Sequence, residues 1–292
     1  MPLTKSATKH GHKKSLKFEA IGTLWGIESP RVDQLQRKIR QTIAEFEQIF
    51  SRFRDDSLVH QMSCRSGEFV LPIYATEMIA LYGQLERISG GSFTPLIGKN
   101  MIEAGYDSAY SLNPSELTVN ERWQAIAEVD GPVIRISQPV HVDFGAAAKG
   151  LLVDVIAKLL QQETSDPYII NAGGDIYSSH RLKIGLEHPL DAWKLIGSVE
   201  LSSGSLCGSS ANRRDWGDYH HIIDGNQLHS PRTVLATWAT ANNTMMADIF
   251  STVLQLVDPI KLKHFDFEYA IIYVDGRFVK SKGFPGTIHE VH

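Results

Sequence analysis

Apolar residues recur every three or four positions in several long stretches of the chain, which is the spacing of an amphipathic helix. This spacing predicts helices over residues 33–53, 73–89 and 244–258, the last of which ends before Pro259. Residues 141–177 read differently, as a strand, a turn of small residues, a helix, a strand, a Gly-Gly turn and a final strand. The apolar face of the helix in this segment consists of Leu152, Val153, Val155, Ile156, Leu159 and Leu160.

Shorter runs rich in β-branched and aromatic residues predict strands between these helices. They lie at residues 17–27 (interrupted at Gly22-Thr23), 133–136, 182–190, 194–201, 205–209 and 268–276. Residues 115–136 are hard to assign, apart from the strand that residues 133–136 predict. Many strands interleaved with about four helices predict an α+β fold, in which helices pack on mixed or antiparallel sheets. We expect a single domain over residues 17–292, with room for two intimate subdomains.

Composition narrows the class of protein. The chain has 292 residues, of which 42% are hydrophobic and 21% charged, as in an ordinary globular protein. Its net charge of −4 gives no electrostatic case for binding nucleic acid. Cys64 and Cys207 lie far apart in the sequence, and their spacing matches no metal-binding or redox motif. This favours two reduced thiols in a reducing compartment.

The first residues are basic and polar, with no apolar run before Phe18 and no cysteine that could carry a lipid. We expect residues 1–16 to form a disordered tail. No apolar run approaches the ~20 residues of a membrane span. These features predict a cytoplasmic protein without a membrane span.

The small residues Gly145 to Gly150 offer candidate chemistry. They let the backbone approach a ligand closely, and the helix that follows presents unpaired N–H groups and the positive end of its dipole. Lys149 adds a cation, and Asp143 and Asp154 flank the segment with carboxylates. The pattern suits a phosphate-bearing ligand with a metal ion. The same residues are equally compatible with close packing of a strand on a helix.

Asp248 and Thr252 are four residues apart in the last predicted helix, so both side chains lie on one face. A carboxylate and a hydroxyl are hard oxygen ligands of the kind that Mg²⁺ accepts. Taken alone, the pair also fits an aspartate favourable to the helix dipole with a threonine packed below it.

Three short motifs match a known family. They are DFGAAAKG with Asp154 four residues further on, NAGGDI at residues 171–176, and Ala247, Asp248, Ser251 and Thr252 in an A-D-x-x-[AS]-T pattern. Together they resemble the ApbE family, the FAD:protein FMN transferases. One departure is Ala146, which stands where the family usually has a second glycine. The resemblance implies a T-fold-like α+β architecture.

Weaker likenesses extend from about Phe18 to Val274. Ile21 takes the methionine position of the family's opening strand, and Phe53 takes the aromatic position of a turn near the flavin, although it also fits a core position of its helix. In the SGGSFTPLIG segment (residues 89–98), Thr94 replaces an aspartate. Later in the chain, Ser209 and Arg214 match and Gly208 departs, and a family P-x-T-G tail is missing after Asp224.

The resemblance implies Mg²⁺-dependent transfer of FMN from FAD to a Thr or Ser hydroxyl of a target flavoprotein, with release of AMP. The expected catalytic residues are Asp248 and His221. We choose His221 as the base that the acceptor hydroxyl needs, because an imidazole titrates near working pH. The resemblance assigns the metal to Ala148, Asp248, Ser251 and Thr252. The residues expected to contact FAD are Ile21, Phe53, Ser92, Phe93, Thr94, Gly145, Lys149, Leu151, Asn171, Gly173, Gly174, Asp175 and Ile223.

Two alternatives remain open from the sequence. Thr94, Gly208 and the missing tail are compatible with a relative that binds or hydrolyses FAD but has lost protein flavinylation. A non-enzymatic FAD carrier is a third possibility. His221 also fits a structural role, as a strand histidine bonded to Asp224 or the turn. Lys149 fits a pairing with a phosphate or with Asp143 alone. The sequence contains no evident acceptor segment for self-modification.

Overall fold

The computed structural model describes residues 14–211 and 215–289. Most of the tail that was predicted to be disordered, residues 1–13, therefore lies outside the described residues, as does Arg214. Ser15 and Leu16, however, already belong to the first strand, where residues 15–20 pair with residues 23–28. The folded part begins earlier than expected, because Leu16 is a buried core residue.

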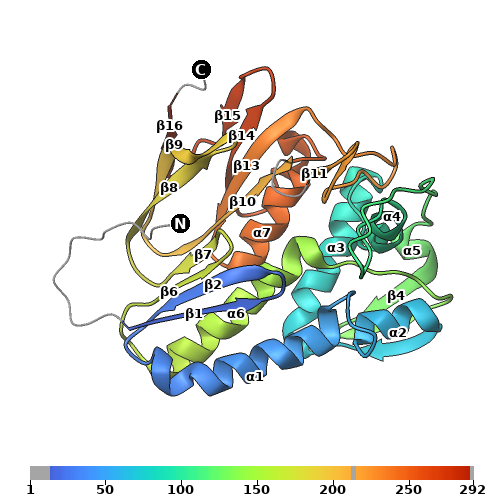
Figure 1. Cartoon of the computed structure of the whole chain (residues 1–292), viewed down its shortest axis with the longest axis horizontal. Coiled ribbons are helices and arrows are strands. Elements are labelled where there is room, and N and C mark those ends of the chain that lie inside the picture. Colours follow the sequence, from blue (N-terminus) through green and yellow to red (C-terminus); the bar gives the residue numbers. More distant parts are fainter. Residues whose placement is uncertain (1–13, 212–214, 290–292) are drawn as a thin grey trace.

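A large antiparallel sheet forms the centre of the molecule (Figure 1). Its strand order is β1-β2-β6-β7-β10-β13-β14-β15, and all its pairings are antiparallel. The strands are β1 (Ser15–Ala20), β2 (Thr23–Glu28), β6 (Ile169–Ala172), β7 (Asp175–Ser178), β10 (Gly204–Ser210), β13 (Val234–Ala241), β14 (Glu268–Tyr273) and β15 (Phe278–Lys280).

Helices cover one face of this sheet. In Figure 1, α1 lies beside α6, which contacts β6 and β7, and α7 packs against β10 and β13. The α-helices are α1 (Val32–Phe50), α2 (Leu58–Cys64), α3 (Thr76–Ser89), α4 (Gly98–Glu103), α5 (Trp123–Ile126), α6 (Gly145–Glu163) and α7 (Thr244–Val253). Short 3₁₀ turns are η1 (Ile73–Ala75), η2 (Pro95–Ile97) and η4 (Pro259–Leu262).

Smaller sheets complete the fold. One has the order β16-β9-β8 and covers the other face of the large sheet, where its Val199 and Leu201 share a buried cluster with Leu206 and Trp238. Another has the order β3-β5-β4, and β11 and β12 form a two-stranded ribbon. Their bounds are β3 (Gly67–Val70), β4 (Ala127–Asp130), β5 (Val133–Ile136), β8 (Leu182–His188), β9 (Asp191–Leu201), β11 (Asp215–Trp216), β12 (Tyr219–His220) and β16 (Gly286–Ile288).

The α+β class and the antiparallel sheets are confirmed. The four predicted helices correspond to α1, η1 with α3, α6, and α7. The interruption at residues 22–23 is a hairpin turn, in which Ile21 and Gly22 have φ of 43° and 70°, the positive values that a type I′ turn requires. Within the described residues, no helix is long and apolar enough to cross a membrane.

One prediction about the central segment was wrong. Residues 141–144 form no strand. The small residues from Gly145 onward form the first turns of α6, as expected of a helix that they open. Ala is the best helix former, so the run of alanines favours a helix that begins at Gly145.

Candidate active site

A cavity of about 670 Å³ lies at the meeting point of α1, α6, α7 and the loops around residues 92, 106 and 221. This volume falls in the range of cofactor pockets, roughly 300–1,000 Å³. It brings together most of the predicted site residues, namely Ile21, Phe53, Ser92, Phe93, Thr94, Gly145, Ala148, Lys149, Gly173, Asp175, His221, Ile223, Asp248 and Thr252. Four predicted residues do not line it: Leu151, Asn171, Gly174 and Ser251.

The start of α6 is held in place by Asp143. Its Oδ1 accepts a hydrogen bond of 2.6 Å from the Gly145 amide, and a side chain at Gly145 would lie only 2.7 Å from the same oxygen. The other oxygen of Asp143 pairs with Arg52 Nε at 2.8 Å. Asp143 therefore does not pair with Lys149, contrary to one of the alternatives that the sequence left open.

Lys149 instead reaches two buried carboxylates. Its Nζ contacts Asp175 Oδ2 and lies 3.7 Å from Asp248 Oδ1. The side chains of Asp175 and Asp248 are only 3% and 7% exposed. Burial raises the pKa of Asp248, while Lys149 and the Gly150 amide oppose that shift. One ammonium thus faces two carboxylates, which leaves this end of the cavity negatively charged and suited to a cation.

Asp154, which was expected to flank the ligand, has a structural position. Its carboxylate accepts hydrogen bonds from the amides of Thr244 (2.7 Å) and Met245 (2.8 Å), the first residues of α7. Burial is the main reason that its pKa rises to about 6. Asp154 therefore ties α6 to the N-terminus of α7, where a carboxylate also complements the helix dipole.

Hydroxyl groups from α7 and β10 meet beside Asp248. Ser209 Oγ lies 3.3 Å from Thr252 Oγ1 and 2.8 Å from Ser251 Oγ. The Ser251 hydroxyl donates to the Asp248 carbonyl, and the Ser251 carbonyl accepts from Thr237 at 2.5 Å. Asp248 and Thr252 thus face the cavity from one side of α7, as their spacing predicted, whereas the Ser251 side chain faces β10.

The Gly-Gly turn between β6 and β7 places Asp175 in this site. Gly173 and Gly174 have backbone φ angles of 64° and 107°, values that residues other than glycine rarely adopt. Asn171 stabilises the turn because its Oδ1 accepts the Gly174 amide at 2.9 Å. Asn171 and Gly174 therefore shape the turn, Gly173 lines the cavity, and Leu151 packs in the core.

Aromatic side chains form another part of the cavity wall, its aromatic end. Phe53 stacks on Tyr110 (centroids 5.5 Å apart, planes at 11°) and meets the edge of Tyr106 at 5.8 Å. The guanidinium of Arg52 lies 4.1 Å from the centre of the Phe53 ring. Arg52, Tyr106 and Tyr110 were missed, because irregular segments carry no periodic signal. The one available cue was the proximity of Arg52 to the predicted Phe53.

Thr94, which departs from the family's aspartate, is satisfied within the protein. Its hydroxyl donates to Glu86 Oε1 at 2.8 Å, and the same carboxylate accepts the amide of Trp123. Asp224 closes the turn after His221 and Ile223, since its Oδ1 accepts the amides of Asn226 and Gln227. The turn therefore forms although the family's P-x-T-G tail is missing.

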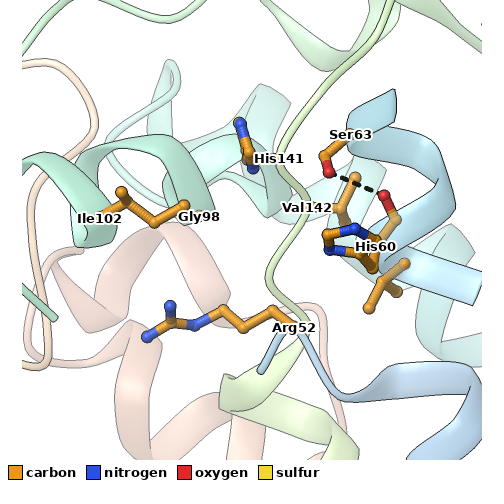
Figure 2. Close-up of a pocket in the computed structure, with 8 residues that line it drawn as sticks. Arg52, His60, Ser63, Gly98, Ile102, His141 and Val142 are labelled. Atoms are coloured by element: carbon orange, nitrogen blue, oxygen red, sulfur yellow. Dashed lines mark hydrogen bonds between the residues drawn. The ribbon is translucent and has the colours of Figure 1, made fainter. Parts of the chain in front are cut away.

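A second cavity lies behind Arg52 and is much smaller, at about 20 Å³ (Figure 2). His60, Ser63 and His141 line it, and the Ser63 hydroxyl donates to the His60 carbonyl. Burial lowers the pKa of His141. A space of this size admits about one water molecule, so it is not a site for an organic ligand.

An antiparallel sheet covered by helices, with buried carboxylates beside a helix start, defines an α+β protein whose cavity can hold a cation next to an anionic ligand. The profile of the ApbE family matches residues 21–266. The chain belongs to the ApbE family.

Known relatives agree with this assignment. A Klebsiella pneumoniae protein named FAD:protein FMN transferase is 33% identical over 132 residues, which are 41% of this chain and 40% of that protein. A Treponema pallidum protein of the same name is 28% identical over 247 residues, 70% of this chain and 67% of the relative. The structure of the flavin transferase ApbE from Vibrio cholerae matches with a TM-score of 0.78 at 19% identity, over 94% of this chain and 98% of that one, which shows a shared fold.

Proposed function

We propose that this protein is an FAD:protein FMN transferase, which moves FMN from FAD to a Thr or Ser hydroxyl of a target flavoprotein and releases AMP. The observation that carries the proposal is the arrangement of one cavity. Its aromatic end is formed by Phe53, Tyr106 and Tyr110, and its charged end by Lys149 and Asp248, beside the start of α6. The aromatic side chains suit the flat ring of a flavin, and the charged residues beside the helix start suit a diphosphate with its cation.

Mg²⁺ fits the oxygen atoms at the charged end. Asp248 and Thr252 would hold it, joined by backbone oxygen from Ala148 and Ser251, and hard oxygen ligands of this kind suit Mg²⁺. The Ser251 carbonyl already accepts a bond from Thr237, which orients it but leaves a second lone pair. When bound, the ion would neutralise charge that develops on the diphosphate.

The chain's own groups position the diphosphate. The cavity side of α6 offers the positive end of a helix dipole, and Lys149 offers an ammonium that can leave its carboxylates for a phosphate. Ser92, Thr94 and Ile223 also line the cavity. The isoalloxazine ring of FAD would lie against Ile21, Phe53 and Phe93.

We assign His221 as the base. The acceptor hydroxyl attacks the phosphorus of the FMN half, the bond between the two phosphates breaks, and the hydroxyl proton passes to the imidazole. His221 lines the cavity, and histidine is the side chain that most often acts as a general base. The displaced AMP leaves with the electron pair of the broken bond.

Three further expectations remain part of this proposal. The partners are FAD and a target flavoprotein, with no nucleic acid. The location is cytoplasmic, and the folded residues act as a single domain. Thr94 stands where the family has an aspartate, and its hydroxyl is hydrogen-bonded to Glu86. The replacement therefore leaves no unpaired polar group at this position, which supports a protein that has kept the transferase activity.

One incubation tests the function against its rivals. The full chain is mixed with FAD, Mg²⁺ and a flavoprotein segment bearing an acceptor Thr, and an acceptor with that Thr changed to Val is the control. The proposal predicts AMP together with fluorescent, covalently labelled acceptor in the Thr sample alone. FMN and AMP without labelling would support a hydrolase, and bound FAD that stays intact would support a carrier. Either result would overturn the transferase assignment.

A further inference from the structure

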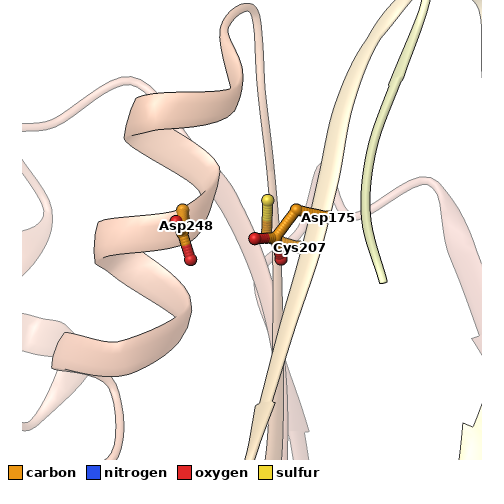
Figure 3. A group of neighbouring side chains, drawn as sticks. All are labelled: Asp175, Cys207 and Asp248. Carbon is orange, nitrogen blue, oxygen red and sulfur yellow. The ribbon is translucent and has the colours of Figure 1, made fainter. Parts of the chain in front are cut away.

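Three side chains that can ligate a metal meet beside the cavity, and one of them is a thiol that the proposed transfer does not use. Asp175, Cys207 and Asp248 each place a ligand atom within 4.8 Å of the other two, and all three residues are buried. Figure 3 shows Asp248 on its helix facing Asp175 and Cys207 on the neighbouring strands. The thiol therefore completes a mixed sulfur and oxygen cluster.

Cys207 faces a polar seam between β10 and α7. Alternate residues of a strand share a face, and the neighbours of Cys207 on this face are Ser205 and Ser209. Their hydroxyls bond to Thr244 and Ser251 of α7, each at 2.8 Å. The Cys207 thiol donates a weak bond of 3.8 Å to the Thr244 carbonyl. A buried free cysteine commonly packs as a small hydrophobe, so this polar surrounding is a separate observation in favour of a ligand role.

The cluster already attracts positive charge. Lys149 Nζ contacts Asp175 and lies 3.7 Å from Asp248, so a cation occupies the space in front of these carboxylates. Two carboxylates against one ammonium leave an excess of negative charge in a buried setting. A divalent ion would balance that charge more completely than the lysine does.

We propose that Asp175, Cys207 and Asp248 form a second cation site, selective for a thiophilic divalent ion such as Zn²⁺. Zn–S bonds of about 2.3 Å and Zn–O bonds of about 2.1 Å would set tetrahedral ligands roughly 3.5 Å apart, a modest closing of the observed cluster. The thiol releases its proton to solvent on coordination, and Lys149 moves aside into the cavity. The fourth position faces the cavity, where water or a phosphate oxygen completes the set.

Selectivity follows from the thiolate. Soft sulfur ligands favour Zn²⁺ and Cd²⁺, whereas Mg²⁺ prefers oxygen and keeps several of its waters. Because the site shares Asp248 with the proposed magnesium site, Zn²⁺ and Mg²⁺ exclude one another. This last consequence rests on the proposed function, whereas binding of the thiophilic ion does not.

The test uses Cd²⁺ as a spectroscopic probe on the full chain without FAD. Cys64 is exposed and its Sγ lies 3.5 Å from His60 Nε2, so it could also bind Cd²⁺. All measurements therefore use a Cys64→Ala background. We expect an ultraviolet sulfur-to-cadmium charge-transfer band that saturates at a single ion per chain, is displaced by Zn²⁺ and is unaffected by equimolar Mg²⁺.

Substitutions at the cluster locate the ion. Adding Cys207→Ala should abolish the band, and adding Asp175→Asn should weaken Cd²⁺ binding while the band survives at saturation. The thermal midpoint in EDTA reports whether each variant folds, and Cys207→Ser serves if the alanine variant does not. No band in the Cys64→Ala protein, or a band that persists without Cys207, would overturn the proposal. A failure of FMN transfer would leave this result untouched, so the two proposals fail separately.

Discussion

The amide of Gly150 donates a hydrogen bond of 2.8 Å to Oδ2 of Asp248, although the two residues lie 98 positions apart. This bond joins α6 to α7 and orients the carboxylate, whose other oxygen lies near Lys149. A side chain at position 150 would stand 2.4 Å from the Thr244 carbonyl and 2.8 Å from Asp248 Cβ. The glycine that follows Lys149 is thus required by the contact between the two helices, and the contact sets the position of Asp248.

Gly150→Ala should therefore separate the two helices. We expect a loss of roughly 1–3 kcal/mol in the free energy of unfolding, the usual cost of overpacking, and weaker Mg²⁺ binding. Urea unfolding and calorimetric titration measure the two effects. Gly26→Ala is the matched control, because a Cβ at position 26 meets nothing within 4 Å. Equal stability and Mg²⁺ affinity in the two variants would contradict this reading.

Lys149→Gln should make the protein more dependent on metal. Without the ammonium, the buried carboxylates of Asp175 and Asp248 repel one another, which should cost about 3 kcal/mol of stability in EDTA. Mg²⁺ should restore more stability to this variant than to the parent, since no lysine competes with the ion. Thermal unfolding with EDTA and with Mg²⁺ gives the comparison. Lys158→Gln, on the exposed side of the same helix, is the control. If Mg²⁺ raises the thermal midpoint of the variant no more than that of the parent, Lys149 does not compete with the ion for the two carboxylates.

Asp154 should give the folding equilibrium a distinct pH dependence. Burial raises its pKa from 3.8 to about 6, so the folded chain holds a proton that the unfolded chain releases between these values. Asp154 therefore adds to the free energy of unfolding in full below about pH 4, and this contribution is lost as the pH rises through about 6. A difference of two pKa units corresponds to roughly 3 kcal/mol.

Asp154→Asn removes this titration. Urea unfolding in EDTA at pH 4.5 and pH 7 should show a smaller fall in stability for the variant than for the parent, by an amount on the order of 1–3 kcal/mol. Asp130→Asn, at the exposed end of β4, should keep the parental fall. An identical fall in the Asp154 variant would show that its carboxyl is not held in its protonated form by burial.

The aromatic end should determine how tightly the flavin binds. Tyr110→Ala removes a ring that stacks on Phe53, and the loss of about 1 kcal/mol corresponds to roughly a fivefold weaker Kd for FAD. Phe53→Ala should weaken binding further, because it removes the ring that also contacts Arg52 and Tyr106. Quenching of FAD fluorescence measures the Kd. Tyr74→Ala, which removes an aromatic ring outside the cavity, should bind FAD as the parent does.

Local pattern predicted the elements better than their contacts. Apolar spacing located α1, α3, α6 and α7, and the Gly-Gly pair located the turn before Asp175, because both signals arise from neighbouring residues. The partner of Asp154 could not be predicted, since its bonds to Thr244 and Met245 join residues 90 and 91 positions away. The same holds for Lys149, whose partners are set by the packing of α6, α7 and β7.

Two features of the site could not be predicted from the sequence pattern. Tyr106 and Tyr110 lie in irregular chain after α4, where neither helical nor strand periodicity applies. Ser251 matched a motif, yet its side chain turns toward Ser209 rather than the cavity. A motif states which residue types recur, but the orientation of a side chain depends on the strands packed against its helix.

The central claim is that a divalent cation held by Asp248 and Thr252 grips the diphosphate of FAD beside the start of α6. Crystals grown with FAD and Mn²⁺, measured for anomalous scattering, test it directly. We predict a manganese peak within bonding distance of Asp248, Thr252 and a diphosphate oxygen, with the flavin against Phe53. A metal peak away from Asp248, or a diphosphate bound outside this cavity, would contradict the account.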